Sequence, residues 1–154
     1  MIQIDRFWVW AHNGSERTLY LDGPIAQESW WGDEVTPEAF KADLEEGDGD
    51  ITVWINSPGG DVFCATKIYN MLKEYPGRVT VRIDAVAASA ASVIAMAGDE
   101  VCMSPLAQIF IHDPQTVAIG STQEMDKAKA MLSEVKEGIL TAYQLKTGLS
   151  RTKL

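Results

Sequence analysis

The feature that most constrains the fold is a strand, a glycine turn, a helix and a second strand that follow one another between residues 51 and 83. Residues 51–56 are mostly β-branched and aromatic, which is typical of a buried strand, and Ser57-Pro-Gly-Gly60 ends that strand sharply. Residues 61–75 then place apolar side chains three and four positions apart, which predicts a helix before the strand at 79–83. Because such a β-α-β unit joins parallel strands, the sequence predicts a mainly parallel sheet.

The same alternation continues through the rest of the chain. Further strands are predicted at residues 6–10 and 18–22, around the turn His12-Asn-Gly-Ser15, and at 101–103 and 108–112. A loop is predicted at 28–34, and helices are predicted from Thr36-Pro37 to the breaker Gly47-Asp-Gly49, over 89–97, and from the capping-box pattern Ser121-Thr-Gln-Glu124 to Thr147-Gly148. We therefore expect one α/β domain over residues 1–154, built from repeated β-α-β units with a long C-terminal helix.

Composition excludes several classes of function. The net charge of −9 argues against a nucleic-acid partner, because phosphate binding needs clustered Lys and Arg. Cys64 and Cys102 have no metal-ligand spacing, and so few thiols favour a reducing cytoplasm. The sequence implies no metal or organic cofactor. The first residues lack the features of a secretion signal, and the longest apolar stretch, 85–97, is too short to span a bilayer.

Ser89 is a candidate nucleophile at the predicted mouth of a helix. The flanking residues are alanines, which leave the hydroxyl exposed, and the N–H of Ala90 would face the same substrate carbonyl. The alternative is that Ser89 is only a helix N-cap and that the alanines allow close helix packing. Ser92, about one turn further, is interpreted as a packing residue.

Gly59 and Gly60 follow a predicted parallel strand, at the edge of the sheet where ligands collect. Adjacent glycines let the backbone approach a substrate closely and turn N–H groups toward one point, as an oxyanion hole requires. The alternative is a tight turn made of ordinary turn-forming residues.

His112 ends a strand of large apolar residues and is followed by Asp113-Pro114. A histidine in that position can take a proton from a serine and return it to a leaving amine. His12, in a polar turn far from any candidate serine, is interpreted as structural.

Together these segments resemble the Clp protease proteolytic-subunit family, and within it the ClpP-like head-maturation proteases of tailed phages and prophages. The resemblance rests on the following segments: residues 19–25, Ile55-Asn-Ser-Pro-Gly-Gly-Asp-Val62, Ala87-Ala-Ser89, Ala97-Gly98, Ile111-His112 with Pro114, and Lys146-Thr-Gly148. Trp30-Trp31-Gly32-Asp33 and the doubled Ala-Ala-Ser resemble phage-type members more than bacterial housekeeping ones.

The resemblance implies a serine endopeptidase with Ser89 as nucleophile, His112 as base, and backbone N–H groups of Gly59, Gly60 and Ala90 as the oxyanion hole. It also implies homo-oligomeric rings that meet through the long helix, a protein or peptide substrate such as a capsid or scaffold protein, and a possible partner ATPase in a bacterial or phage-infected cytoplasm. The family's triad aspartate lies beyond the long helix, and neither Asp113 nor Asp126 matches it. We therefore expect the third triad member to lie in a natural C-terminal segment that this sequence lacks.

Two other functions remain open from the residues alone. A crotonase-like acyl-CoA enzyme would share the β-α-β spiral and an oxyanion hole but would need neither Ser89 nor His112. A catalytically silent assembly subunit would keep the fold without a complete triad.

Overall fold

The structure, a computed structural model, describes residues 6–13, 16–26 and 36–154. The loop expected at 28–34, with Trp30-Trp31-Gly32-Asp33, lies outside the described residues, as do residues 1–5 and the tip of the turn at 14–15. The chain forms two compact units that divide between Phe110 and Ile111.

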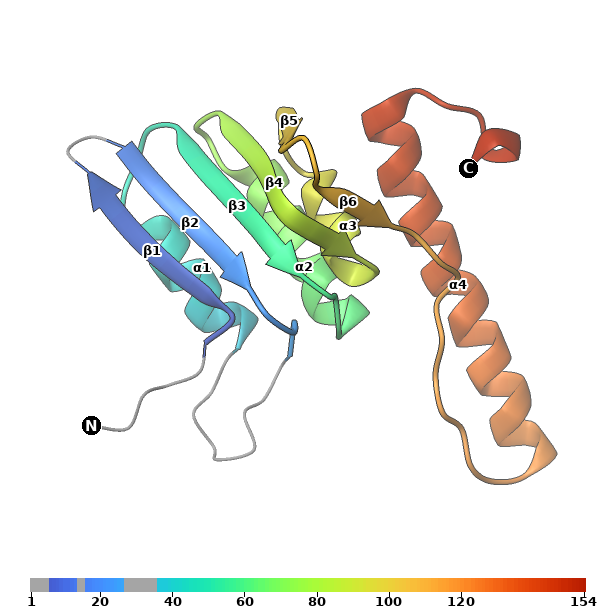
Figure 1. The fold of residues 1–154 in the computed structure, drawn as a ribbon. Helices are drawn as coiled ribbons and strands as arrows, with labels where there is room; N and C mark the ends of the chain where they lie inside the picture. The colour runs from blue at the N-terminus through green and yellow to red at the C-terminus, as the bar shows by residue number, and fades with distance from the viewer. Residues whose placement is uncertain (1–5, 14–15, 27–35) are drawn as a thin grey trace. The chain divides into compact units, whose positions relative to one another are not determined.

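The first unit is built on a six-stranded sheet in the order β1-β2-β3-β4-β5, with β6 also paired to β4 (Figure 1). β1 is antiparallel to β2, and every other pairing is parallel, as the β-α-β pattern predicts. The strands are β1 (Trp8–Asn13), β2 (Glu16–Asp22), β3 (Ile51–Ser57), β4 (Val79–Ala88), β5 (Glu100–Met103) and β6 (Gln108–Phe110).

Three helices cover one face of this sheet, namely α1 (Pro37–Glu45), α2 (Val62–Glu74) and α3 (Ala90–Ala95), which lie behind the strands in Figure 1. Burial therefore alternates along the strands: in β3, Ile51, Val53 and Ile55 are fully buried, whereas Thr52 and Trp54 are half-buried. The sequence predicted a strand of the buried type at residues 51–56, with nearly continuous β-branched and aromatic residues. The difference arises because, in the described unit, the helices pack on one face and leave the other more open.

β4 is the element that differs most from the sequence prediction. It was expected to end at Ile83 but continues to Ala88, because its first half pairs with β5 and its second half pairs with β6. Along the other edge, β4 advances from Ile83 to Ala87 while β3 advances only from Ile55 to Ser57, which marks a bulge. The added length carries the strand directly to Ser89.

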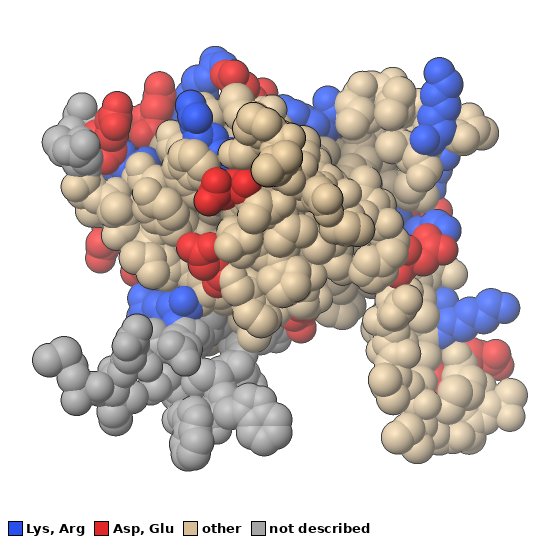
Figure 2. Space-filling model, in the orientation of Figure 1, with Lys and Arg blue, Asp and Glu red and all other residues tan. Residues whose placement is uncertain are grey.

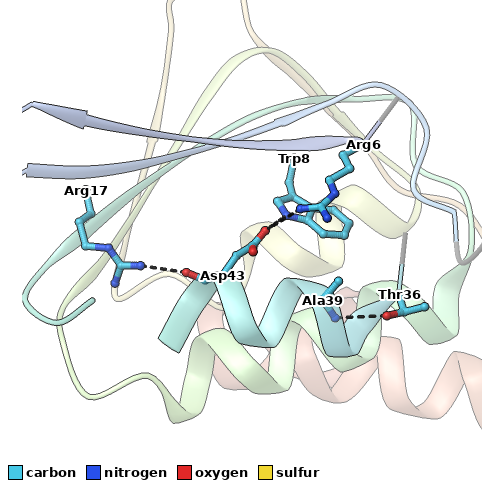
Figure 3. A network of polar contacts seen from close by, with 6 residues as sticks. All are labelled: Arg6, Trp8, Arg17, Thr36, Ala39 and Asp43. Carbon is cyan, nitrogen blue, oxygen red and sulfur yellow. Dashed lines mark hydrogen bonds and ion pairs between the residues drawn. The ribbon is translucent and has the colours of Figure 1, made fainter. Parts of the chain in front are cut away.

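Other boundaries shift by a few residues. The first two strands extend toward their turn, with His12 opposite Arg17 in the register, and the predicted 108–112 strand ends at Phe110. α3 is shorter than the predicted 89–97 helix. Thr36 is the N-cap of α1, as predicted, and accepts a hydrogen bond from the N–H of Ala39 at 3.2 Å (Figure 3).

Arg17 fixes the C-terminal end of α1 to the sheet (Figure 3). Its guanidinium donates to the carbonyl oxygens of Asp43 and Leu44 at 3.1 Å and to that of Gly47 at 2.6 Å. The carbonyls of Asp43 and Leu44 lie in the last turn of α1 and have no N–H partner within the helix, so the buried guanidinium supplies their hydrogen bonds. Its positive charge is also favourable at the C-terminal end of the helix dipole. On the same helix, the carboxylate of Asp43 accepts from Trp8 Nε1 at 2.8 Å.

The second unit contains α4 (Thr122–Thr147) and a short 3₁₀ helix, Arg151–Lys153. α4 begins after Ser121, whose hydroxyl bonds to the Glu124 carboxylate, and ends at Gly148 in the left-handed conformation with φ 69°. Both ends lie where the sequence predicts them. In the part of the chain that the structure describes, no helix has the length and apolar character needed to cross a membrane.

Charged side chains are interspersed over the surface shown in Figure 2, and the described residues in that view form no continuous basic area. This mixture of signs accompanies the net charge of −9.

The contacts of Arg17 generate a stability prediction. Replacing Arg17 with Met should lower the free energy of unfolding by roughly 2–4 kcal/mol, because the carbonyl groups at the end of α1 lose their charged donor. Arg6→Met is the control, since Arg6 makes a partly exposed ion pair with Asp43 and its loss should cost less than about 1 kcal/mol. Urea unfolding at one fixed protein concentration measures both values, and equal losses would contradict this account of Arg17.

Candidate active site

Ser89 occupies a strained turn between the end of β4 and the start of α3. Its backbone has φ 52° and ψ −123°, and it is the only non-glycine residue among those described that has a positive φ. Such a conformation costs about 1–3 kcal/mol, and strand-to-helix turns of this kind are used to present a serine hydroxyl at the edge of a sheet. Ser89 is half-buried, and its side chain makes no capping hydrogen bond to α3. The alternative of a simple N-cap is therefore not what the turn shows.

Backbone hydrogen bonds hold this turn on both sides. The N–H of Ser89 donates to the carbonyl of Phe110, the last residue of β6, at 2.8 Å. The carbonyl of Ser89 accepts from the N–H of Ser92 at 3.0 Å and also from the Ser92 hydroxyl. Strand pairing thus fixes the entry to the turn, and α3 fixes its exit.

Gly59 packs directly against the turn. A Cβ added to Gly59 would lie 2.6 Å from the carbonyl oxygen of Ala88, 2.8 Å from Ser89 Cβ and 3.0 Å from the nitrogen of Ala90. Only a residue without a side chain can approach this closely, and the φ of +92° at Gly59 also favours glycine. The structure therefore brings together the double-glycine bend, Ser89 and Ala90, which lie about thirty positions apart in the sequence.

Gly60 is held from the opposite side by Ile25. A Cβ on Gly60 would lie 2.1 Å from the carbonyl oxygen of Ile25, and the two residues form an isolated parallel bridge. The N–H of Ile25 donates to the carbonyl of Gly59 at 2.9 Å, and the N–H of Asp61 donates to the carbonyl of Ile25 at 2.8 Å. The bend is therefore clamped between Ile25 and the Ser89 turn.

The amide of Gly59 already has a hydrogen-bond partner within the protein. The N–H of Gly59 donates to Ser57 Oγ at 3.1 Å, and the Ser57 hydroxyl donates in turn to the carbonyl of Gly23 at 2.7 Å. The expectation that Gly59 supplies an N–H to a substrate is therefore at odds with this hydrogen bond. Gly59 instead provides the space that Ser89 occupies, a role that turn residues alone do not reveal.

His112 belongs to the second unit and is described there. Its Nδ1 lies 2.6 Å from the carbonyl oxygen of Asp113. Because a carbonyl can only accept, Nδ1 donates in this contact, and the neutral ring that makes it has its lone pair on Nε2. The imidazole is exposed and lines a cavity of about 330 Å³ together with apolar side chains of α4, among them Ile139 and Leu140.

Asp113 and Asp126 are the acidic residues considered for the third position of a triad, and neither directs its carboxylate to a hydrogen bond with the imidazole in the described part of the chain. The Asp113 carboxylate pairs with Lys136 at 2.8 Å, and only the backbone carbonyl of Asp113 meets the His112 ring. Asp126 lies exposed on α4. No group of three His, Cys, Asp or Glu side chains within 6–13, 16–26 and 36–154 is arranged to hold a metal ion.

Cys64 does not compete with Ser89 as a nucleophile. Burial raises the pKa of the Cys64 thiol to about 11, so the reactive thiolate is scarce at neutral pH. The thiol is directed to the carbonyl of Ala26, with a sulfur–oxygen distance of 3.9 Å.

Comparison with known proteins identifies relatives along most of the chain. The model of the Clp protease family matches residues 8–154. The ATP-dependent Clp protease proteolytic subunit of Deinococcus radiodurans is 24% identical over 141 residues, which cover 90% of this chain and 68% of that protein. The protein of the same name from Bacteroides fragilis is 30% identical over 107 residues, which cover 68% of this chain and 52% of that protein. The match thus spans about half the length of this second relative.

The packing of Gly59 generates a prediction that separates close contact from backbone strain. Gly59→Ala should destabilise the protein by more than about 2 kcal/mol and reduce the reactivity of Ser89, because the new methyl group would collide with the turn.

Gly49→Ala is the matched control, since Gly49 has φ +85° but nothing within 4 Å of an added Cβ. It should carry only the strain of about 1–3 kcal/mol and leave the reactivity of Ser89 unchanged. Unfolding free energies and labelling by a serine-directed probe measure the two effects. Equal losses of labelling in both variants would contradict the proposed contact.

Proposed function

The chain belongs to the Clp protease family, a family of serine-type peptidases, and we propose that it hydrolyses peptide bonds through an acyl-enzyme on Ser89. The observation that carries this proposal is the strained turn that presents Ser89 beside the double-glycine bend. A serine that merely capped a helix would need neither the positive φ nor a glycine packed against its Cβ.

In the proposed first step, Ser89 Oγ attacks the carbonyl carbon of the scissile bond while its proton passes to Nε2 of His112. The tetrahedral intermediate collapses as the C–N bond breaks, and the imidazolium returns the proton to the leaving amine. A water molecule then attacks the acyl-enzyme, with His112 again accepting and returning a proton. The overall reaction consumes one water and releases an amine and a carboxylic acid.

Two features support His112 as the base. Its Nδ1–H faces the carbonyl of Asp113, which leaves Nε2 as the proton acceptor. In addition, His112 follows Phe110 by two positions, and the carbonyl of Phe110 accepts the N–H of Ser89. Chain connectivity alone limits the separation of the Phe110 and His112 α-carbons to about 7 Å.

For the oxyanion hole we propose the N–H groups of Gly60 and Ala90. Ala90 is the first residue of α3, so its amide has no acceptor within the helix. Gly59 supports this site through its missing side chain, since its own N–H donates to Ser57. Loss of one such donor typically lowers the rate about 100- to 1,000-fold.

The third triad member is not assigned to a described residue. Asp113 pairs through its carboxylate with Lys136, and its contact with the imidazole is made by the backbone carbonyl. We propose that residues 1–154 form a single peptidase domain, and we leave the carboxylate that would orient His112 unassigned.

The proposal extends to assembly and biological role. We propose that copies of the chain form closed rings through α4, whose 26 residues include only Ala142 and Tyr143 as buried ones. Exposed Met125 and Met131 on this helix are suited to a subunit contact. The doubled Ala-Ala-Ser around Ser89 favours a phage or prophage role in maturing capsid or scaffold proteins, in the cytoplasm of a bacterium or infected host. We include a partner ATPase in this proposal only for folded substrates, which would have to be unfolded before they are cut.

The nucleophile is tested with a fluorophosphonate probe. Ser89→Ala should abolish covalent labelling and reduce peptide hydrolysis by a factor on the order of 10³ or more, while the solution mass of the assembly stays unchanged. Ser133→Ala is the control, because that hydroxyl lies exposed on α4 and bonds to the Lys129 carbonyl. Labelling that persists in Ser89→Ala would assign the nucleophile elsewhere.

The base is tested by comparing the two histidines of the chain. His112→Ala should slow fluorophosphonate labelling by about 100- to 10,000-fold, because Ser89 loses its proton acceptor. His12→Ala, in the exposed part of β1, should leave the rate unchanged. Equal labelling rates in wild type and His112→Ala would remove His112 from the mechanism.

A further inference from the structure

Ser92 has a buried hydroxyl that the proposed mechanism does not use. The residue is 1% exposed and lies in α3 between the core residues Ala91 and Val93. A hydroxyl in such a place needs a hydrogen-bond partner, because burial without one is costly. The hydroxyl of Ser92 donates to the carbonyl oxygen of Ser89.

The same carbonyl oxygen also accepts from the backbone N–H of Ser92, at 3.0 Å. One residue thus holds the Ser89 carbonyl with two donors. A main-chain amide is present whatever the side chain at this position, but the second donor exists only because residue 92 is a serine. Alanine, which occupies the neighbouring positions 90, 91 and 95, would fill the same space in the core without it.

The orientation of this carbonyl matters because it belongs to the peptide unit between Ser89 and Ala90. That unit is planar, so its carbonyl and its N–H point in opposite directions and rotate together. Fixing the Ser89 oxygen therefore also fixes the direction of the Ala90 N–H. It fixes as well the ψ of −123° that accompanies the strained φ of 52° at Ser89.

A relaxed turn would rotate this peptide unit, carrying the carbonyl away from Ser92 and the Ala90 N–H away from the bend at Gly59. Gly59 opposes relaxation by its closeness, since even an added Cβ at this position would come within 2.8 Å of Ser89 Cβ and 3.0 Å of the nitrogen of Ala90. Ser92 opposes it from the core side by hydrogen bonding. The strained turn is thus held from two directions.

We propose that Ser92 is a positioning residue, whose hydroxyl holds the Ser89–Ala90 peptide unit in the orientation that presents both the nucleophile and the Ala90 oxyanion donor. The inference rests on the proposed function of Ser89. It replaces the interpretation of Ser92 as a packing residue, because packing does not require the hydroxyl.

The experiment compares wild type with Ser92→Ala in the assembled protein. Ser92→Ala should lower kcat for a peptide substrate roughly 10-fold with KM little changed, because the lost bond acts on the transition state and not on substrate binding. Affinity for a peptide boronic acid, which forms a tetrahedral adduct on the serine, should fall by the same factor as kcat/KM. Ser92→Thr keeps the hydroxyl and should recover most of both losses.

Val93→Ala is the control for loosening of α3, since Val93 is buried in the same helix and its side chain carries no donor for the Ser89 carbonyl. It should lower the unfolding free energy more than Ser92→Ala does, yet change boronate affinity less. If Val93→Ala reduces boronate affinity as much as Ser92→Ala, or if Ser92→Ala keeps wild-type kcat and affinity, the positioning role is overturned.

These outcomes are separate from failure of the proposed function. Wild-type kcat in Ser92→Ala combined with loss of labelling in Ser89→Ala rejects the role of Ser92 and leaves the nucleophile in place. A wild-type protein that the fluorophosphonate never labels rejects the nucleophile, and with it the role of Ser92.

Discussion

At the end of the parallel sheet, Gly59 lies so close to the Ser89 turn that an added Cβ would come within 2.6 Å of the Ala88 carbonyl oxygen and 2.8 Å of Ser89 Cβ. This approach is possible only because Gly59 has no side chain. The contact joins the turn after β3 to the turn after β4, so two consecutive β-α-β crossovers meet at one point. Parallel strands make this meeting possible, since their carboxyl ends share one edge of the sheet. A site that needs both a serine hydroxyl and backbone N–H groups directed toward the same point can therefore form where these two turns meet.

β4 leads directly into this turn and is held by strand pairing on both of its edges. It pairs with β3 along one edge, and with β5 and then β6 along the other. The final pairing ends at Ala88 opposite Phe110, whose carbonyl then accepts the N–H of Ser89. The strain at Ser89 is therefore sustained by ladder hydrogen bonds on one side and by the buried start of α3 on the other, as strained functional residues require. The farther edge of the unit is tied down by Arg17 and the end of α1, which keeps the helical layer in place behind β2.

The two units carry different parts of the proposed chemistry. The first contains the nucleophile and the amides, all held by core packing. The second contains His112, with its Nδ1–H on a neighbouring carbonyl, and the long helix α4. A carbonyl fixes the tautomer of an imidazole but does not stabilise its positive charge as a carboxylate does. This difference is the physical reason why the Asp113 carbonyl is not taken as the third triad member.

Residue types and their spacing were sufficient for the order of strands and helices, the parallel sheet, and the family. They also placed the caps at Thr36, Ser121 and Gly148, because capping depends on residues within one helical turn. They selected Ser89 and His112 as catalytic residues and Gly59, Gly60 and Ala90 for the oxyanion hole, and these selections remain predictions. The continuation of β4 through an alanine-rich segment, the positive φ of Ser89, and the hydrogen bonds of Ser57 and Ser92 were decided by the tertiary structure alone. Each of these depends on a partner from another element or on the orientation of a single peptide unit, and local sequence preferences contain neither.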